Sequence, residues 1–157
     1  MRALALLLLF VGCTKPTTPP PAVDDCTLET KLVPGVPGSP GHLISSEINP
    51  NGASELATLM RTFVADWRAV RTQLETDAGV PSAKFPVHKK MRCAWPTSLD
   101  DRNAQYDALA VGYLAKVKAF DVKPSRETYE GVLDGCQACH EVTCGGPLEV
   151  IAGLRWK

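Results

Sequence analysis

Apolar side chains recur at steps of three and four residues over most of the chain after residue 50, which is the spacing of one face of an α-helix. The first stripe begins at Leu56 and ends at Leu74, and it predicts a helix over residues 54–77. Ser54 or Asn51 would cap its first turn, because either side chain can accept a hydrogen bond from a free backbone N–H. No stretch of useful length alternates between polar and apolar residues, so the sequence predicts no strand.

Two further signals follow this helix. A short helix is expected within residues 82–94, because Pro86 fits a first helical turn and Pro96 cannot continue a helix. Ser98 and Asp101 form a capping pair that would open the next long helix. The apolar stripe of that helix consists of Tyr106, Leu109, Ala110, Tyr113, Leu114, Val117 and Phe120.

The last long helix is expected to start at Asp121 and Pro124, and its stripe reaches His140. Residues 147–156 predict a short extra helix packed on the outside. Four helices joined by short connections favour an all-α fold, an antiparallel four-helix bundle in which facing stripes bury one core and leave room for a cofactor between helices.

The first 50 residues differ in composition from the rest. Eight of the 13 prolines lie in residues 14–50, and Gly-Pro punctuation there prevents a long regular element. This region therefore predicts an irregular arm in front of the bundle. The chain divides into a leader at residues 1–12, a linker and arm at residues 13–50, and a helical domain at residues 51–157.

The leader has the pattern of an export signal. Its apolar run, residues 3–12 behind Arg2, would cover only about 15 Å as a helix, half of a bilayer. The residues Phe10-Val11-Gly12-Cys13 resemble the lipobox of bacterial lipoproteins, in which the cysteine is acylated and becomes the mature N-terminus. The resemblance implies an exported protein with a lipid anchor on Cys13, and Thr14 favours the outer membrane, facing the periplasm. An ordinary leader with an incidental cysteine is the alternative.

Charge and cysteine content narrow the class of protein. The 17 basic and 17 acidic residues cancel, whereas a nucleic-acid binder needs a basic surplus, so no nucleic-acid partner is expected. Six cysteines in 157 residues indicate an oxidising compartment or cofactor chemistry.

The sequence Cys136-Gln137-Ala138-Cys139-His140 matches the attachment pattern for haem c. Two thiols one helical turn apart can add to the two vinyl groups of one haem, and the following imidazole can bind its iron. A redox Cys-x-x-Cys pair is the first alternative, but that pair normally lies in a βαβ unit. Half of a zinc site is the second, with Cys144 as a further ligand.

With this motif on the last long helix of a helical domain, residues 51–142 resemble the cytochrome c′ family. The resemblance implies one haem c held by Cys136 and Cys139, with His140 as the proximal iron ligand. It also implies a possible homodimer. Cys144 stands where the family commonly has a basic residue.

The sixth iron position is open at this point. Low-spin relatives of the bundle use a methionine on the first helix, which implies Met60 here; Met60 could also serve core packing alone. Met91 is the runner-up, His88 and His42 are weaker candidates, and an open sixth position is the last possibility.

Lipid and haem leave three cysteines, of which two can pair. We expect Cys93 to pair with Cys144, because the end of the short helix and the end of the last long helix would meet at one end of a bundle. Pairing of Cys26 with either would instead hold the arm.

The leading functional hypothesis is a membrane-anchored monohaem electron carrier that acts with redox partner proteins and is not an enzyme. The alternative is a gas-binding haem module with an open iron face for nitric oxide or carbon monoxide. A structural lipoprotein without haem is the third.

Overall fold

The computed structural model describes residues 26–76, 79 and 84–156, and this part of the chain is helical. Three long helices, α1 (Glu55–Thr76), α3 (Ala104–Val122) and α4 (Arg126–Thr143), are accompanied by the short helices α2 (Lys84–His88) and α5 (Leu148–Leu154). Two 3₁₀ turns, η2 (Lys89–Arg92) and η3 (Leu99–Asp101), complete the set. The all-α prediction is confirmed. The predicted leader at 1–12 and Cys13 lie outside the described residues.

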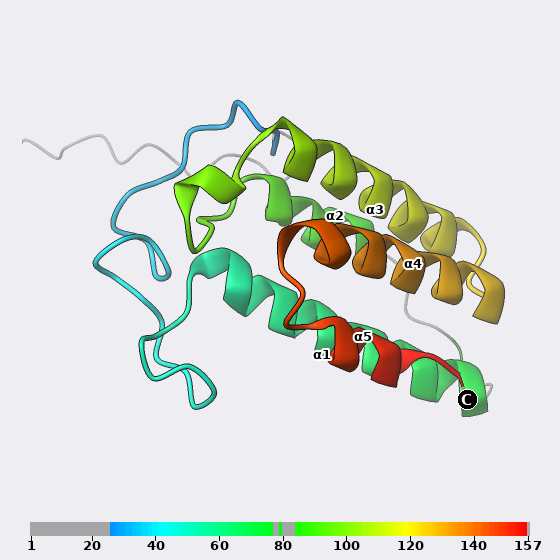
Figure 1. The fold of residues 1–157 in the computed structure, drawn as a ribbon. Coiled ribbons are helices and arrows are strands. Elements are labelled where there is room, and N and C mark those ends of the chain that lie inside the picture. Colours follow the sequence, from blue (N-terminus) through cyan, green and yellow to red (C-terminus); the bar gives the residue numbers. More distant parts are fainter. Residues whose placement is uncertain (1–25, 77–78, 80–83, 157) are drawn as a thin grey trace, which may run out of the picture.

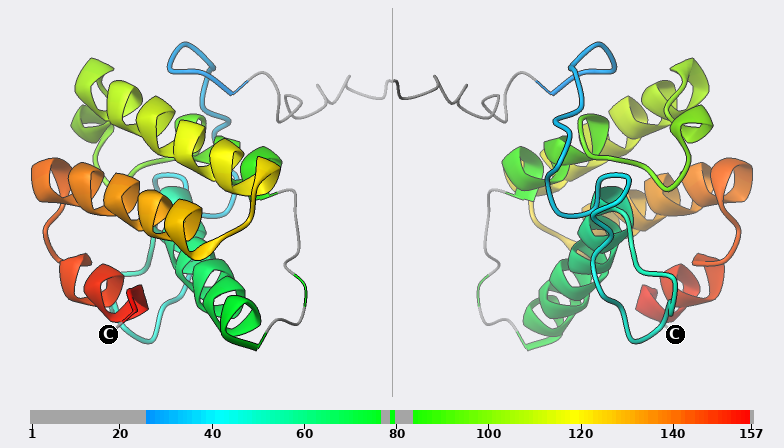
Figure 2. Two further views of the ribbon diagram at one scale, coloured as in Figure 1. Left: turned by 90° about the vertical axis from the view of Figure 1, so that its right-hand side faces the viewer. Right: turned by 90° about the vertical axis from the view of Figure 1, so that its left-hand side faces the viewer.

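The fold is built on the pair of long helices α3 and α4. These two lie side by side in antiparallel directions, and α1 passes beneath them with α5 alongside it (Figure 1). In the two views of Figure 2, α1 runs at a clear angle to α3 and α4. The closest backbone neighbours of α1 are α5 and η2, so α1 is held to the pair mainly through the shorter elements.

The predicted stripes form the core. Trp67 and Val70 of α1 are fully buried against Phe120 of α3 and Tyr129 and Leu133 of α4. The Trp67 ring meets the edges of both Phe120 and Tyr129, which is a favourable arrangement for aromatic pairs. Periodicity therefore identified the buried face of each long helix correctly.

The helix starts were predicted less well. Ser54 caps α1 as expected, accepting a hydrogen bond from the backbone of Ala57. Ser98, however, caps only the short turn η3, and Asn103 caps α3 by accepting from the backbone of Tyr106. The predicted opening at Ser98 and Asp101 is thus wrong for the long helix.

The expected start of the last helix at Asp121 is wrong as well. Asp121 belongs to the end of α3, which continues to Val122. Ser125 caps α4 and forms a reciprocal capping box with Thr128. Asp121 instead accepts hydrogen bonds from the backbone N–H groups of Lys84 and Phe85 and so caps α2.

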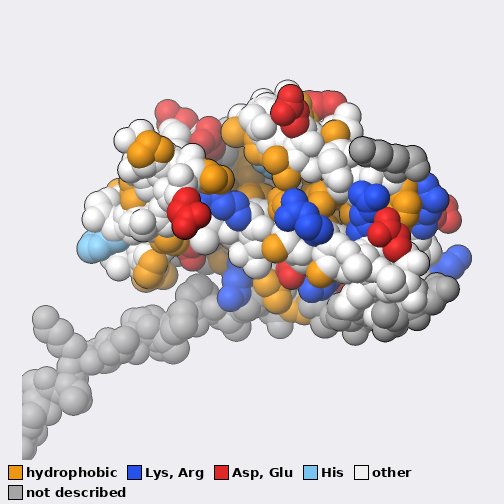
Figure 3. Space-filling model, turned by 90° about the horizontal axis from the view of Figure 1, so that it is seen from below, with side chains coloured by type: hydrophobic (Ala, Val, Ile, Leu, Met, Phe, Trp, Pro, Cys, Tyr) orange, Lys and Arg blue, Asp and Glu red, His pale blue; other side chains and the backbone are white. Residues whose placement is uncertain are grey.

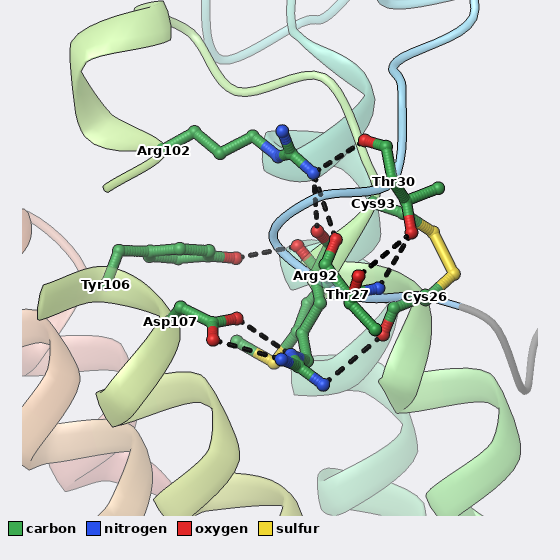
Figure 4. A network of polar contacts seen from close by, with 9 residues as sticks. Cys26, Thr27, Thr30, Arg92, Cys93, Arg102, Tyr106 and Asp107 are labelled. Carbon is green, nitrogen blue, oxygen red and sulfur yellow. Dashed lines mark hydrogen bonds and ion pairs between the residues drawn. A yellow bond between two sulfur atoms is a disulfide. The ribbon is translucent and has the colours of Figure 1, made fainter. Parts of the chain in front are cut away.

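The arm is attached to the helical domain by a disulfide and several hydrogen bonds. Cys26 pairs with Cys93, and Cys144 is an exposed free cysteine, so the predicted Cys93–Cys144 pair is wrong. The cause lies in two arginines that bind the arm beside Cys93 (Figure 4). Arg102 donates to the carbonyl groups of Thr27 and Thr30, and Arg92 donates to that of Cys26 while it pairs with Asp107.

Further along, the arm follows the start of α1. The Trp95 indole donates to the carbonyl of Val33 at 2.6 Å, and Ile44 and Ala53 form an isolated antiparallel bridge. Gly38 lies at a positive φ directly against the backbone of Glu55, where a side chain has no room. The backbone N–H of Glu55 donates to the Gly38 carbonyl.

The predicted short C-terminal helix is present as α5, which packs on the outside of the domain through one face. Ile151 and Leu154 are buried, and the Leu154 carbonyl accepts a hydrogen bond from Tyr129, whereas Glu149 and Val150 are exposed. Arg155 binds Glu130 and Asp134 of α4 and holds the end of the helix there. Among the described residues, no helix has the length and apolar character needed to cross a membrane.

Candidate cofactor site

A cavity of about 510 Å³ lies between α1, α4 and α5. This volume falls within the range of small-molecule and cofactor sites. Its walls are mostly apolar, with contributions from the arm, η2 and α3 as well. Residues that line it include Ile48, Ala57, Met60, Phe63, Val64, Trp67, Met91, Tyr113, Cys136, Cys139, His140, Pro147, Val150, Ile151 and Leu154. The cavity exists because α1 is inclined away from α4, and α5 closes the side that this leaves open.

The attachment motif occupies the last turns of α4 and faces this cavity. Cys136, Cys139 and His140 are spaced by three and four residues, which places them on one helix face. All three line the cavity wall. Burial raises the pKa of Cys136 to about 12 and that of Cys139 as well, so both thiols are protonated at neutral pH. The structure thus brings the three motif residues to one wall of an apolar space.

The ring of His140 is oriented by the turn that follows the helix. Its Nδ1 lies 2.9 Å from the carbonyl oxygen of Cys144. A carbonyl oxygen can only accept, so Nδ1 carries a proton, and the neutral form of the ring has its free electron pair on Nε2. Histidines that bind metals are commonly oriented in this way, by a hydrogen bond from the other ring nitrogen. Cys144 therefore contributes its backbone, and not its thiol, to the site.

Two of the four candidates for the sixth iron position line the cavity. Met60 of α1 is partly buried, and Met91 of η2 is buried at 3% exposure. The Met91 carbonyl accepts a hydrogen bond from Tyr106 at 2.8 Å, which fixes the backbone of η2 at that point. The structure leaves both methionines as candidates.

The two histidine candidates lie elsewhere. His88 is completely buried beside Phe63 and Tyr113 and does not line the cavity. His42 is exposed in the arm. Neither of these rings belongs to the wall that faces the motif.

Two basic residues on the cavity wall were not singled out from the sequence. Arg61 and Arg68 of α1 both line the cavity, and neither has an acidic partner among the described residues. They lie two turns apart on α1, so they share one helix face. Figure 3 shows basic side chains set among apolar ones across the underside of the molecule. Their position could have been found by asking which charged residues flank the apolar stripe of the first helix.

The zinc alternative requires several ligands close together. Among residues 26–76, 79 and 84–156, no group of three or more histidine, cysteine, aspartate or glutamate side chains is placed to hold a metal ion. The thiol of Cys144, which that alternative needs, is exposed on the turn after α4. A haem iron needs only one protein nitrogen on the proximal side, which His140 offers.

Comparison with known proteins finds no family model, no curated protein and no solved structure that matches this chain.

Proposed function

We propose that this protein is a monohaem c-type cytochrome that carries single electrons, with the haem attached to Cys136 and Cys139 and its iron bound by His140. One observation carries the proposal: all three motif residues line the same wall of a largely apolar cavity of about 510 Å³. The presence of the motif in the sequence does not by itself require a cavity next to it, so the cavity is independent support for a bound cofactor. The proposed fold is a four-helix bundle, and its short second helix consists of α2 together with η2.

The residues around the cavity fit this cofactor. The two cysteines would hold the ring covalently, the apolar walls would exclude water, and Nε2 of His140 is free to bind a metal. Arg61 and Arg68 are suited to bind the two carboxylates that a haem carries. When bound, a haem supplies an iron that gains or loses one electron.

The opposite face of the iron is the part of the site that decides between carrier and gas binder. We propose Met60 as the sixth ligand, since α1 forms the wall across the cavity from α4 and a thioether is a suitable soft ligand. Met91 is the alternative on the same cavity. An iron without a sixth protein ligand would instead make the protein a module that binds nitric oxide or carbon monoxide.

The cellular setting stays a proposal from the sequence. We propose export, a lipid anchor on Cys13 and a place at the outer membrane facing the periplasm, with the proline-rich residues 15–21 as the spacer that holds the domain off the lipid surface. The partners would then be redox proteins of that compartment. We also propose a homodimer, which a measurement of the oligomeric state in solution tests.

The experiment is expression of the chain with c-type haem maturation, followed by denaturation and acid-acetone extraction. Haem that stays with the polypeptide supports the proposal, whereas haem that is fully extracted contradicts it. Unchanged covalent haem in a Cys136→Ser, Cys139→Ser variant also contradicts it.

The sixth ligand is tested with Met60→Ala and the matched Met91→Ala. Loss of the low-spin spectrum in Met60→Ala alone supports the carrier. A high-spin wild-type spectrum with rapid carbon monoxide binding assigns the gas-binding alternative.

A further inference from the structure

A buried polar cluster borders the cavity without being part of the attachment motif. The His88 ring is fully buried and stacks on Phe63 with 3.8 Å between the ring centroids. Its Nδ1 lies 2.6 Å from the Tyr113 hydroxyl, and its Nε2 lies 3.6 Å from a carboxylate oxygen of Asp66. Tyr113 lines the cavity, so the cluster reaches from a partly exposed carboxylate to the cofactor site.

The partners of each polar group determine where the protons of this cluster lie. The indole of Trp67 can only donate, and it donates to the Tyr113 hydroxyl at 3.0 Å. Asp66 faces Nε2 of His88, and a carboxylate can only accept, so the neutral His88 ring carries its proton on Nε2. Nδ1 then accepts from the Tyr113 hydroxyl. That Nε2 has no hydrogen-bond partner among the described residues, because 3.6 Å to Asp66 is too long.

The charges around His88 come from three elements. Asp66 of α1 and Asp121 of α3 favour the protonated ring, and Lys84 of α2 opposes it. Burial is the largest influence and lowers the pKa of His88 to about 4. The buried phenol of Tyr113 is neutral, with its pKa raised well above the ordinary value by burial. Asp66 is therefore placed to stabilise a second proton on the His88 ring, but this ring is neutral at pH 7.

We propose that His88 is a proton-binding site whose occupancy is coupled to the oxidation state of the cofactor, and that Tyr113 transmits the coupling. The inference rests on the proposed function. It adds that, in the acid range below about pH 6.5, the carrier takes up a proton from solvent when it accepts an electron and releases the proton when it is oxidised.

The coupling follows from the geometry of Tyr113. A protonated His88 has N–H groups on both nitrogens, so Nδ1 becomes a donor to the Tyr113 oxygen. The hydroxyl proton must then turn away from His88. Tyr113 packs against Gly135, the neighbour of Cys136 on α4, and both Tyr113 and Cys136 line the cavity. The positive end of the O–H bond would point to the attachment site of the cofactor and favour its electron-rich, reduced state.

The proposed step transfers one electron and one proton in each direction. One electron enters from a one-electron donor, a redox protein in the cell or dithionite in the experiment. One proton from solvent becomes bound to His88, where Asp66 stabilises the added charge. The covalent bonds of Tyr113 do not change, and oxidation returns both the electron and the proton.

The test is a redox titration of the haem-loaded protein between pH 4 and pH 8. We expect the midpoint potential to fall as pH rises through the acid range below about 6.5, by at most about 59 mV per pH unit for one proton and one electron, and to be constant above it. His88→Phe, which keeps an aromatic ring on Phe63, should abolish this dependence, and Tyr113→Phe should weaken it. The exposed His42→Phe is the matched control and should behave like the wild type. Wild-type dependence in His88→Phe would overturn the proposal.

A second measurement avoids the variants. The pKa of His88, followed by the NMR signals of its ring in the intact haem-loaded protein, should be higher in the reduced than in the oxidised state. Equal values in the two states would overturn the coupling. Absence of covalently bound haem would instead overturn the proposed function, so the two failures are distinguishable.

Discussion

The Cys26–Cys93 disulfide fixes the arm to the helical domain and allows a direct test of that attachment. Its two cysteines are separated by 67 residues along the chain. In the loop-entropy model, closing a loop of this length restricts the unfolded chain by about 4 kcal/mol. Replacing both cysteines by serine should therefore lower the free energy of unfolding by about 4 kcal/mol. This is a large share of the roughly 5–15 kcal/mol that stabilises an ordinary domain.

The assay is urea unfolding of the intact chain, followed by circular dichroism of the helices. With a slope of about 2 kcal/mol per molar urea, the midpoint should fall by about 2 M in the double variant. Cys144→Ser is the matched control and should leave the midpoint unchanged, because Cys144 is exposed and unpaired. A loss below about 1 kcal/mol in the double variant would refute the reasoning. A non-reduced digest that links Cys93 to Cys144 would refute the pairing itself.

Three further substitutions test the packing and the charges. Gly38→Ala should destabilise the chain by about 1–3 kcal/mol more than Gly41→Ala in urea unfolding. Both glycines have a positive φ, but only Gly38 lies against the backbone of Glu55. Equal losses of stability in the two variants would contradict this close contact. Ser125→Ala should cost about 1 kcal/mol through loss of the α4 cap, and an unchanged thermal midpoint would show that the cap contributes nothing. His88 is buried with its pKa lowered to about 4, so an unfolded chain binds a proton there between about pH 6.5 and 4 that the folded chain does not. Stability should accordingly decrease by up to about 3 kcal/mol as pH falls through that range, and His88→Phe should show a shallower decrease in urea unfolding at several pH values.

The sequence predicted best what depends on neighbours along the chain. The stripe from Leu56 to Leu74 belongs to one long helix, and its buried members Trp67 and Val70 are in the core. The spacing of Cys136, Cys139 and His140 placed them on one helix face, as the structure shows. Each of these properties follows from 3.6 residues per turn and needs no knowledge of the fold.

Tertiary contacts decided the features that were predicted wrongly. Asp121 looks like a helix start in the sequence, but it lies in the last turn of α3, where its carboxylate caps α2. Cys93 could have paired with either of two cysteines. The choice of Cys26 depends on Arg92 and Arg102, which bind the arm backbone beside it. These contacts join residues far apart in the sequence, so the spacing of nearby residues does not predict them.

The cavity depends on elements that lie far from the attachment motif in sequence. Its open side is closed by Ile151 and Leu154 of α5, and α5 is held in place from its end. There Arg155 pairs with Glu130 and Asp134, and Arg71 of α1 donates to the carbonyl of Arg155. These contacts tie α1 and α4 together through α5 instead of directly. The helices can therefore stay apart at the motif, because the contacts that would otherwise close the gap are made at the C-terminal end of the chain.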